Sequence, residues 1–144
     1  RKYPRFRPHW ARRPIMIITD GANSVTLPDD LDWTDELSWS PVQQSAEPSI
    51  TGATIVQIQA RQSGRPITLE GTDTRYVSGA GVAQLHAWSQ APGQELTLTL
   101  RGVSRAVIFR HHDAPAFTAR EIFGRVPTLD ASQSYEITLK LMEI

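Results

Sequence analysis

Apolar and polar residues alternate along much of the chain, with the two-residue period of half-buried β-strands. The alternation is clearest at Leu96–Leu100, where three leucines flank two threonines. Weaker or shorter versions of the pattern predict further strands at 15–19, 24–27, 53–60, 67–69, 106–110, 116–122 and 135–144. Glutamine and proline interrupt 42–50, which predicts a poor strand at a sheet edge.

One segment has a helical period instead. Val82, Leu85 and Trp88 recur at a spacing of three, and alanines between them favour helix. Ser78 is a suitable N-terminal cap, and Pro92-Gly93 ends the pattern. We therefore predict a short helix that buries these three side chains and turns Gln84 and Gln90 to the other face.

Together these elements predict one β-rich domain over residues 15–144, folded as a β-sandwich or a partly closed barrel with one helix. The length of 144 residues suits a single domain of this kind. The longest uninterrupted apolar run is only Ile15–Ile18, so we expect no membrane insertion by this chain.

Residues 1–14 differ from this body and predict an extended basic arm. Residues 1–13 carry six Arg or Lys and no acid, whereas the rest carries nine basic and fifteen acidic residues. Prolines at intervals disfavour helix there. The arm could bind nucleic acid through phosphates, or pack on its own body or on a neighbouring subunit. We favour a contact with another subunit or with a partner protein, through the candidate residues Tyr3, Arg5, Phe6, Arg7, Trp10, Arg12 and Arg13.

The tryptophans predict burial rather than an exposed binding row. We expect Trp39 and Trp88 to lie in the core, because each would bury a large area. Trp33 suits the core and a subunit contact equally, so we include it among the candidate contact residues. The loop that contains Trp33 and Trp39 also holds Leu37, and we expect Trp33, Leu37 and Trp39 to point inward.

Catalytic and metal-binding patterns are weak. The chain has no cysteine, which excludes thiol chemistry and thiolate metal sites. His111 and His112 are adjacent, so in a strand they would point to opposite faces and could not share an ion. The acids between Asp29 and Glu36 lack the spacing of a calcium loop and predict a solvated acidic loop. We predict a protein that is not an enzyme and has no cofactor or metal.

Several short segments give the body a resemblance to tail proteins of long-tailed bacteriophages, over about residues 15–144. These segments are Leu27–Leu31 with Trp33, Trp39–Gln44, Ser63–Leu69, Phe109–Pro115 and Leu139–Ile144. The chain most resembles a distal tail protein, a small component of the tail tip or baseplate. The resemblance implies a β-sandwich with a flanking helix, related to tail-tube proteins.

The resemblance also implies a function. A distal tail protein forms a homo-oligomeric ring, sixfold like the tail tube, which joins the tube to the hub and surrounds the DNA channel. The implied partners are further copies of the chain and the tail-tube, tape-measure and hub proteins, with DNA only passing through. The protein would then be assembled in the host cytoplasm and reside in the virion. A peripheral adaptor for receptor-binding fibres and a tail-associated hydrolase remain as alternatives.

Overall fold

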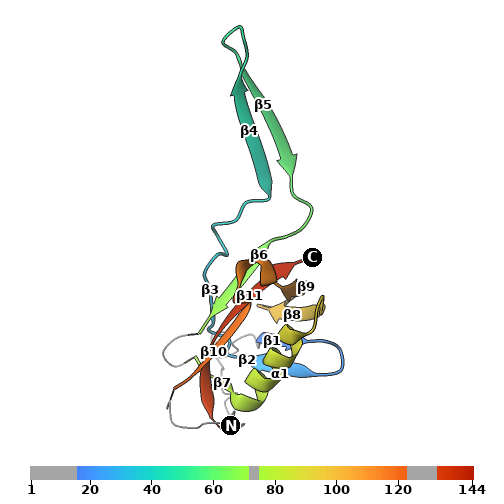
Figure 1. Ribbon diagram of the computed structural model, residues 1–144, viewed down its shortest axis with the longest axis vertical. Helices are drawn as coiled ribbons and strands as arrows, with labels where there is room; N and C mark the ends of the chain where they lie inside the picture. Colours follow the sequence, from blue (N-terminus) through green and yellow to red (C-terminus); the bar gives the residue numbers. More distant parts are fainter. Residues whose placement is uncertain (1–15, 72–74, 123–132) are drawn as a thin grey trace, which may run out of the picture.

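The computed structural model describes residues 16–71, 75–122 and 133–144, and shows a β-rich body with a long hairpin projecting from it (Figure 1). The body is built on a nine-stranded antiparallel sheet and one helix, α1 (Gly79–Gln90). The hairpin is a separate two-stranded sheet. The predicted mainly-β fold with one helix is therefore confirmed.

The nine-stranded sheet runs in the order β2-β1-β8-β9-β11-β6-β3, with β7 and β10 also pairing with β11. Its strands are β1 (Met16–Thr19), β2 (Ser24–Leu27), β3 (Asp32–Trp33), β6 (Pro66–Glu70), β7 (Val77–Ser78), β8 (Leu96–Leu100), β9 (Val103–Phe109), β10 (Phe117–Glu121) and β11 (Ser134–Glu143).

The sheet is open, so the predicted partly closed barrel is wrong. It ends at β2 on one side and β3 on the other, and these two strands do not pair. The second sheet does not form a sandwich layer either, because every residue of its two strands is exposed. A barrel would need β2 and β3 to meet, and β3 is only two residues long.

Strand β11 organises the body because it is long and pairs with four other strands. Its first residues pair with β7 and β10, and its last with β6 and β9. Strand β9 connects it to the other half of the sheet: residues 103–107 pair with β8, and 107–109 with β11. This division lets one sheet curl around a single core.

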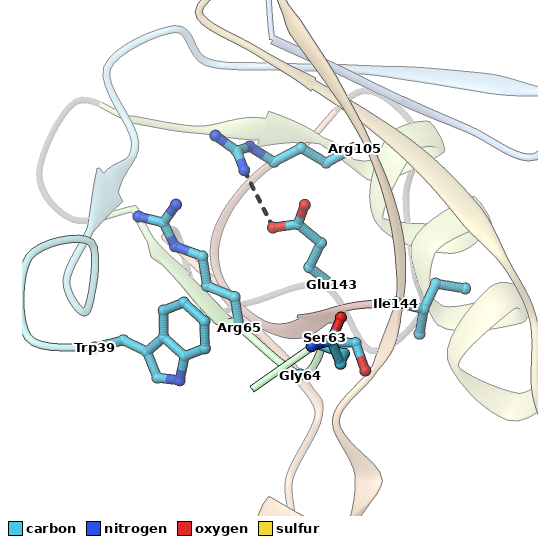
Figure 2. Close-up of a pocket in the computed structure, with 8 residues that line it drawn as sticks. Trp39, Ser63, Gly64, Arg65, Arg105, Glu143 and Ile144 are labelled. Carbon is cyan, nitrogen blue, oxygen red and sulfur yellow. Dashed lines mark hydrogen bonds and ion pairs between the residues drawn. The ribbon is translucent and has the colours of Figure 1, made fainter. Parts of the chain in front are cut away.

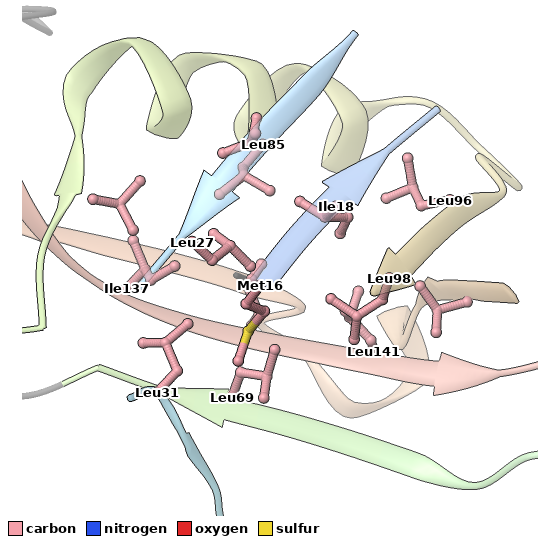
Figure 3. Close-up of a cluster of buried hydrophobic side chains, with 14 of the residues drawn as sticks. Met16, Ile18, Leu27, Leu31, Leu69, Leu85, Leu96, Leu98, Ile137 and Leu141 are labelled. Atoms are coloured by element: carbon pink, nitrogen blue, oxygen red, sulfur yellow. The ribbon is translucent and has the colours of Figure 1, made fainter. Parts of the chain in front are cut away.

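The core lies between the two halves of the curled sheet and beneath α1 (Figure 3). Alternate residues of each strand enter it, as the period-two pattern predicts. Residues that are almost completely buried come from β1, β6, α1, β8, β9 and β11, and they are Ile18, Ile67, Leu69, Leu85, Leu98, Val107, Ile137, Leu139 and Leu141.

Helix α1 confirms the prediction from its spacing. The Ser78 hydroxyl accepts a hydrogen bond from the Gly81 N–H at 3.4 Å, and Val82, Leu85 and Trp88 are buried. At Gly81, an added Cβ would lie only 3.1 Å from Val25 Cγ1 and 3.0 Å from Val77 Cγ1. The glycine therefore lets the helix approach β2 closely.

Trp88 also ties the helix to the turn between β1 and β2. Its indole N–H donates to Asp20 Oδ2 at 2.9 Å. The backbone N–H of Asn23 and that of Ala22 donate to the same carboxylate. These three donors, with Asn23 first, hold the pKa of Asp20 below its usual range, because each stabilises the charged form.

Trp88→Ala should lower the free energy of unfolding by about 3–5 kcal/mol, because it leaves a large cavity under the helix. Trp88→Phe should cost clearly less, since it keeps most of the packing and mainly removes the hydrogen bond to Asp20. Urea denaturation of both variants would measure this. Gln90→Ala, on the exposed face of α1, is the control, and an equal loss in all three would contradict the packing of the helix.

Candidate functional site

The projecting hairpin is the most unusual surface of the described chain. Its strands β4 (Val42–Pro48) and β5 (Thr54–Ala60) pair along their whole length, from Val42 opposite Ala60 to Pro48 opposite Thr54. Every residue of both strands is exposed, and Figure 1 shows the pair standing away from the body. The strand predicted at 53–60 is confirmed as β5. For 42–50 the sequence predicted only a poor edge strand, whereas the structure has the seven-residue strand β4 there.

The hairpin is amphipathic, because residues opposite each other in an antiparallel pair share one face. One face is mostly apolar and holds Val42, Gln44, Ala46, Pro48, Thr54, Val56, Ile58 and Ala60. The other face is mostly polar and holds Gln43, Ser45, Glu47, Ile55, Gln57 and Gln59. On the apolar face, Ile58 is 67% exposed and Val42 is 52% exposed.

An isolated two-stranded hairpin with such a face is poorly suited to water. Two strands alone are marginally stable, and an exposed apolar surface on a soluble protein usually marks a contact. Within the described residues the outer edges of β4 and β5 pair with no other strand, so their backbone groups can also accept a partner. The hairpin therefore has the features of an assembly surface.

The tip of the hairpin is an ordered turn that presents one apolar side chain. The Ser49 N–H donates to the Ala53 carbonyl at 2.7 Å, and the Gly52 N–H to the Ser49 carbonyl at 3.0 Å. Gly52 has a φ of +86°, which glycine adopts without strain. Ile50 is fully exposed at this tip. A side chain held out in this way can enter a hollow on another molecule.

The root of the hairpin is held by stacked cations and indoles. The Arg65 guanidinium carbon lies 4.7 Å from the centre of the Trp33 ring and 5.8 Å from that of Trp39. Arg105 lies 5.5 Å from the Trp33 ring. Because Trp39 precedes β4 and Arg65 follows β5, this stack joins both ends of the hairpin to the body.

The acidic segment before the hairpin is tied to the body rather than solvated, which corrects the prediction for Asp29–Glu36. Asp35 accepts hydrogen bonds from the Thr68 N–H and hydroxyl at 3.0 and 2.9 Å. Arg110, only 8% exposed, lies 3.6 Å from the same carboxylate. The further ion pairs of this segment are Asp30–Arg75, Asp32–Arg75 and Glu36–Arg101.

A small cavity opens beside the root (Figure 2). It has a volume of about 240 Å³ and is lined by Trp39, Gln62, Ser63, Gly64, Arg65, Arg105, Glu143 and Ile144. Glu143 accepts from Arg105 at 3.1 Å. Arg65 donates only to the Glu36 carbonyl, at 3.1 Å, and has no carboxylate within ion-pair distance among the described residues. Among the side chains that line the cavity, Arg65 is thus the one cation without an acidic partner.

The predicted contact residues have different outcomes. Trp33 is half-buried against the core and lies between two arginines, as part of the root. Tyr3, Arg5, Phe6, Arg7, Trp10, Arg12 and Arg13 lie outside the described residues. Leu37 was expected to point inward, and that is wrong: it is 95% exposed in a turn. Trp39, expected in the core, is only half-buried at the root.

His111 and His112 are exposed and lie in a short 3₁₀ helix, His111–Asp113, which follows β9. Asp113 of this helix pairs with Arg110 and Lys140 at 3.3 Å each. No group of three or more His, Asp or Glu side chains in the described ranges could hold a metal ion. No helix in those ranges is long and apolar enough to cross a membrane.

No protein-family model matches the chain, and no curated protein matches it. The hairpin and its root are therefore described from their geometry alone. In the sequence, only the alternation at 53–60 indicated them. Trp39 and Arg65 are far apart along the chain, and the pairing of β4 with β5 brings them together.

Asp35→Ala should lower the free energy of unfolding by about 2–4 kcal/mol, because the Thr68 N–H and hydroxyl lose their acceptor and the buried Arg110 keeps only its pair with Asp113. Urea denaturation would measure the loss. Arg120→Ala is the matched control: Arg120 is 81% exposed in its pair with Glu136, and its removal should cost under about 1 kcal/mol. Equal losses in both variants would contradict an anchored acidic segment.

Proposed function

We propose that this protein is a structural ring component of a bacteriophage tail tip, which joins the tail tube to the hub and surrounds the DNA channel. The observation that carries the proposal is the projecting hairpin, with its exposed apolar face and open edges. The resemblance of the body sequence to distal tail proteins supplies the setting. Further copies of the chain are the first partners, in a sixfold ring that contacts the tail-tube, tape-measure and hub proteins.

A ring accounts for the hairpin in physical terms. A hairpin that binds a different surface of the next copy makes a head-to-tail contact, and such contacts close into rings when the rotation allows it. Burying Val56 and Ile58 in this contact would contribute about 1–2 kcal/mol each. The same burial would remove the exposed surface that makes an isolated hairpin unfavourable.

The charge of the hairpin also fits a DNA channel. Its polar face carries glutamines and a serine, with Glu47 as the one charged residue between 42 and 60. A face without cations does not hold the phosphate backbone. If the part of this face that carries Gln43, Ser45, Gln57 and Gln59 lines the channel, DNA passes without being bound, as a tail tip requires.

Replacing Val56 and Ile58 together by serine should abolish assembly and leave the body folded, because these side chains make no core contact. Gln57→Ser with Gln59→Ser, on the opposite face of the same strand, is the matched control and should retain assembly. Mass by light scattering and electron microscopy of the particles would measure both, with sixfold rings expected for the unmodified chain.

The outcomes separate the alternatives. Rings that persist in the Val56 and Ile58 double variant would contradict the hairpin as the assembly surface. A chain that stays monomeric, and appears as peripheral density in tails, would favour the adaptor for receptor-binding fibres. Threefold or single copies in a tail-tip map would contradict the sixfold ring.

The basic arm is assigned to contacts between subunits or with an adjacent tail protein. The described residues offer it few free acids, because most acids pair internally. The acids without an ion pair or side-chain hydrogen bond are Glu70 and Glu95 in the body and Glu47 in the hairpin. The aromatic residues of the arm would therefore supply most of its anchoring, since exposed ion pairs contribute about 0–1 kcal/mol each.

Deleting residues 2–13 should weaken subunit association or tail joining, because it removes these anchors, while the body keeps its thermal stability. Light scattering and circular dichroism would measure the two properties. Substituting alanine for Tyr3, Phe6 and Trp10 alone should reproduce most of the loss. Normal assembly with reduced DNA affinity would contradict this role and favour nucleic-acid binding.

A further inference from the structure

We infer that the cavity at the hairpin root receives the hairpin tip of another copy, with the Glu47 carboxylate of that copy paired to Arg65. This rests on the proposed function, because it requires copies to associate. The inference names the contact between neighbouring copies. In this contact, a carboxylate at the hairpin tip of one copy enters the cavity at the hairpin root of the next.

Arg65 is a cation that lacks an acidic partner. Arg65 is half-buried and its guanidinium lies 4.7 Å from the Trp33 ring centre and 5.8 Å from that of Trp39, yet it pairs with no carboxylate among the described residues. Among the described residues, Arg61 is the one other arginine without an ion pair, and it is exposed. The arginines that do have ion pairs are Arg75, Arg101, Arg105, Arg110 and Arg120. A partly desolvated cation gains from an acidic partner supplied by another molecule.

The lining of the cavity is mostly polar and includes two apolar side chains, Trp39 and Ile144. Its charged side chains are Arg65, Arg105 and Glu143, and Arg105 already engages Glu143, so Arg65 is the one left without a partner. About 240 Å³ is enough for one or two side chains and too little for a typical cofactor. The cavity therefore suits one acidic and one apolar side chain.

The hairpin tip offers that combination of side chains. Glu47 is the one charged residue between 42 and 60, and it has no ion pair or side-chain hydrogen bond in the described chain. Ile50 is fully exposed three residues further on. Glu47 matches Arg65 in charge, and Ile50 matches the walls formed by Trp39 and Ile144.

The length of the hairpin makes this a contact between copies. Seven paired residues span roughly 24 Å at about 3.4 Å each, so tip and root of one hairpin lie far apart. Glu47 cannot fold back onto Arg65 of its own chain while the hairpin stays extended. The pair must therefore form between copies, with a tip on one and a root on the other.

Cysteine cross-linking tests the contact directly, because the chain has no cysteine of its own. A Glu47→Cys variant mixed with a Ser63→Cys variant should form a disulfide-linked pair of chains on mild oxidation. Glu95→Cys is the matched control: Glu95 is also an exposed acid without a partner in the described chain, but it lies just before β8 in the body. It should give no cross-link with Ser63→Cys above background.

Charge reversal gives a second, independent measurement. Glu47→Arg should weaken association about tenfold or more, and its folding is unaffected because Glu47 contacts nothing in the described body. Glu47→Gln, which removes the charge and nearly keeps the size of the side chain, should weaken association in the same direction. Glu95→Arg, which reverses an exposed acid of the body, is the matched control and should leave association unchanged.

The results separate this inference from the function on which it rests. Rings that form without the cross-link between positions 47 and 63, and that are unaffected by Glu47→Arg, would overturn the tip-in-root contact and leave the ring. A cross-link in particles of only two chains would support the contact and contradict the ring. Neither association nor cross-link at high protein concentration would overturn both.

Discussion

The contact of Arg65 with the Trp33 and Trp39 rings is the interaction that fixes both ends of the hairpin to the body. It adds to the backbone hydrogen bonds between residues 64–65 and Glu143, because it also holds Trp39 in the segment before β4. Cation–π contacts of this kind are worth more when the groups are partly desolvated, as they are at this root. The acidic segment also holds the root in place, because Asp35 of this segment accepts a hydrogen bond from Thr68 of β6 and pairs with Arg110.

The molecule therefore has two parts with opposite relations to water. The body buries its apolar side chains around β11, which pairs with four strands and closes the core. The hairpin exposes its apolar face completely and has no core of its own. A sequence that keeps both parts is understandable if the hairpin is buried against another molecule, since the isolated face would only favour aggregation.

Internal pairing also changes the electrostatics that the composition suggests. The composition, a basic arm and an acidic body with fifteen Asp or Glu, suggests that the arm is attracted to the body as a whole. In the described body most of these acids already have arginine, lysine or tyrosine partners, and Glu47 is one of the few that remain. Its place near the hairpin tip makes the remaining charge local rather than spread over the surface.

The sequence by itself determined the local elements. The alternation at Leu96–Leu100 and the spacing of Val82, Leu85 and Trp88 identified a strand and a helix, because burial on one face imposes a fixed period. Tertiary structure alone decided that the sheet stays open, that Asp35 is an anchor and that Trp39 stacks on Arg65. These depend on pairings between distant segments, such as β4 with β5 and β6 with β11, and a local period carries no information about which distant strand is the partner.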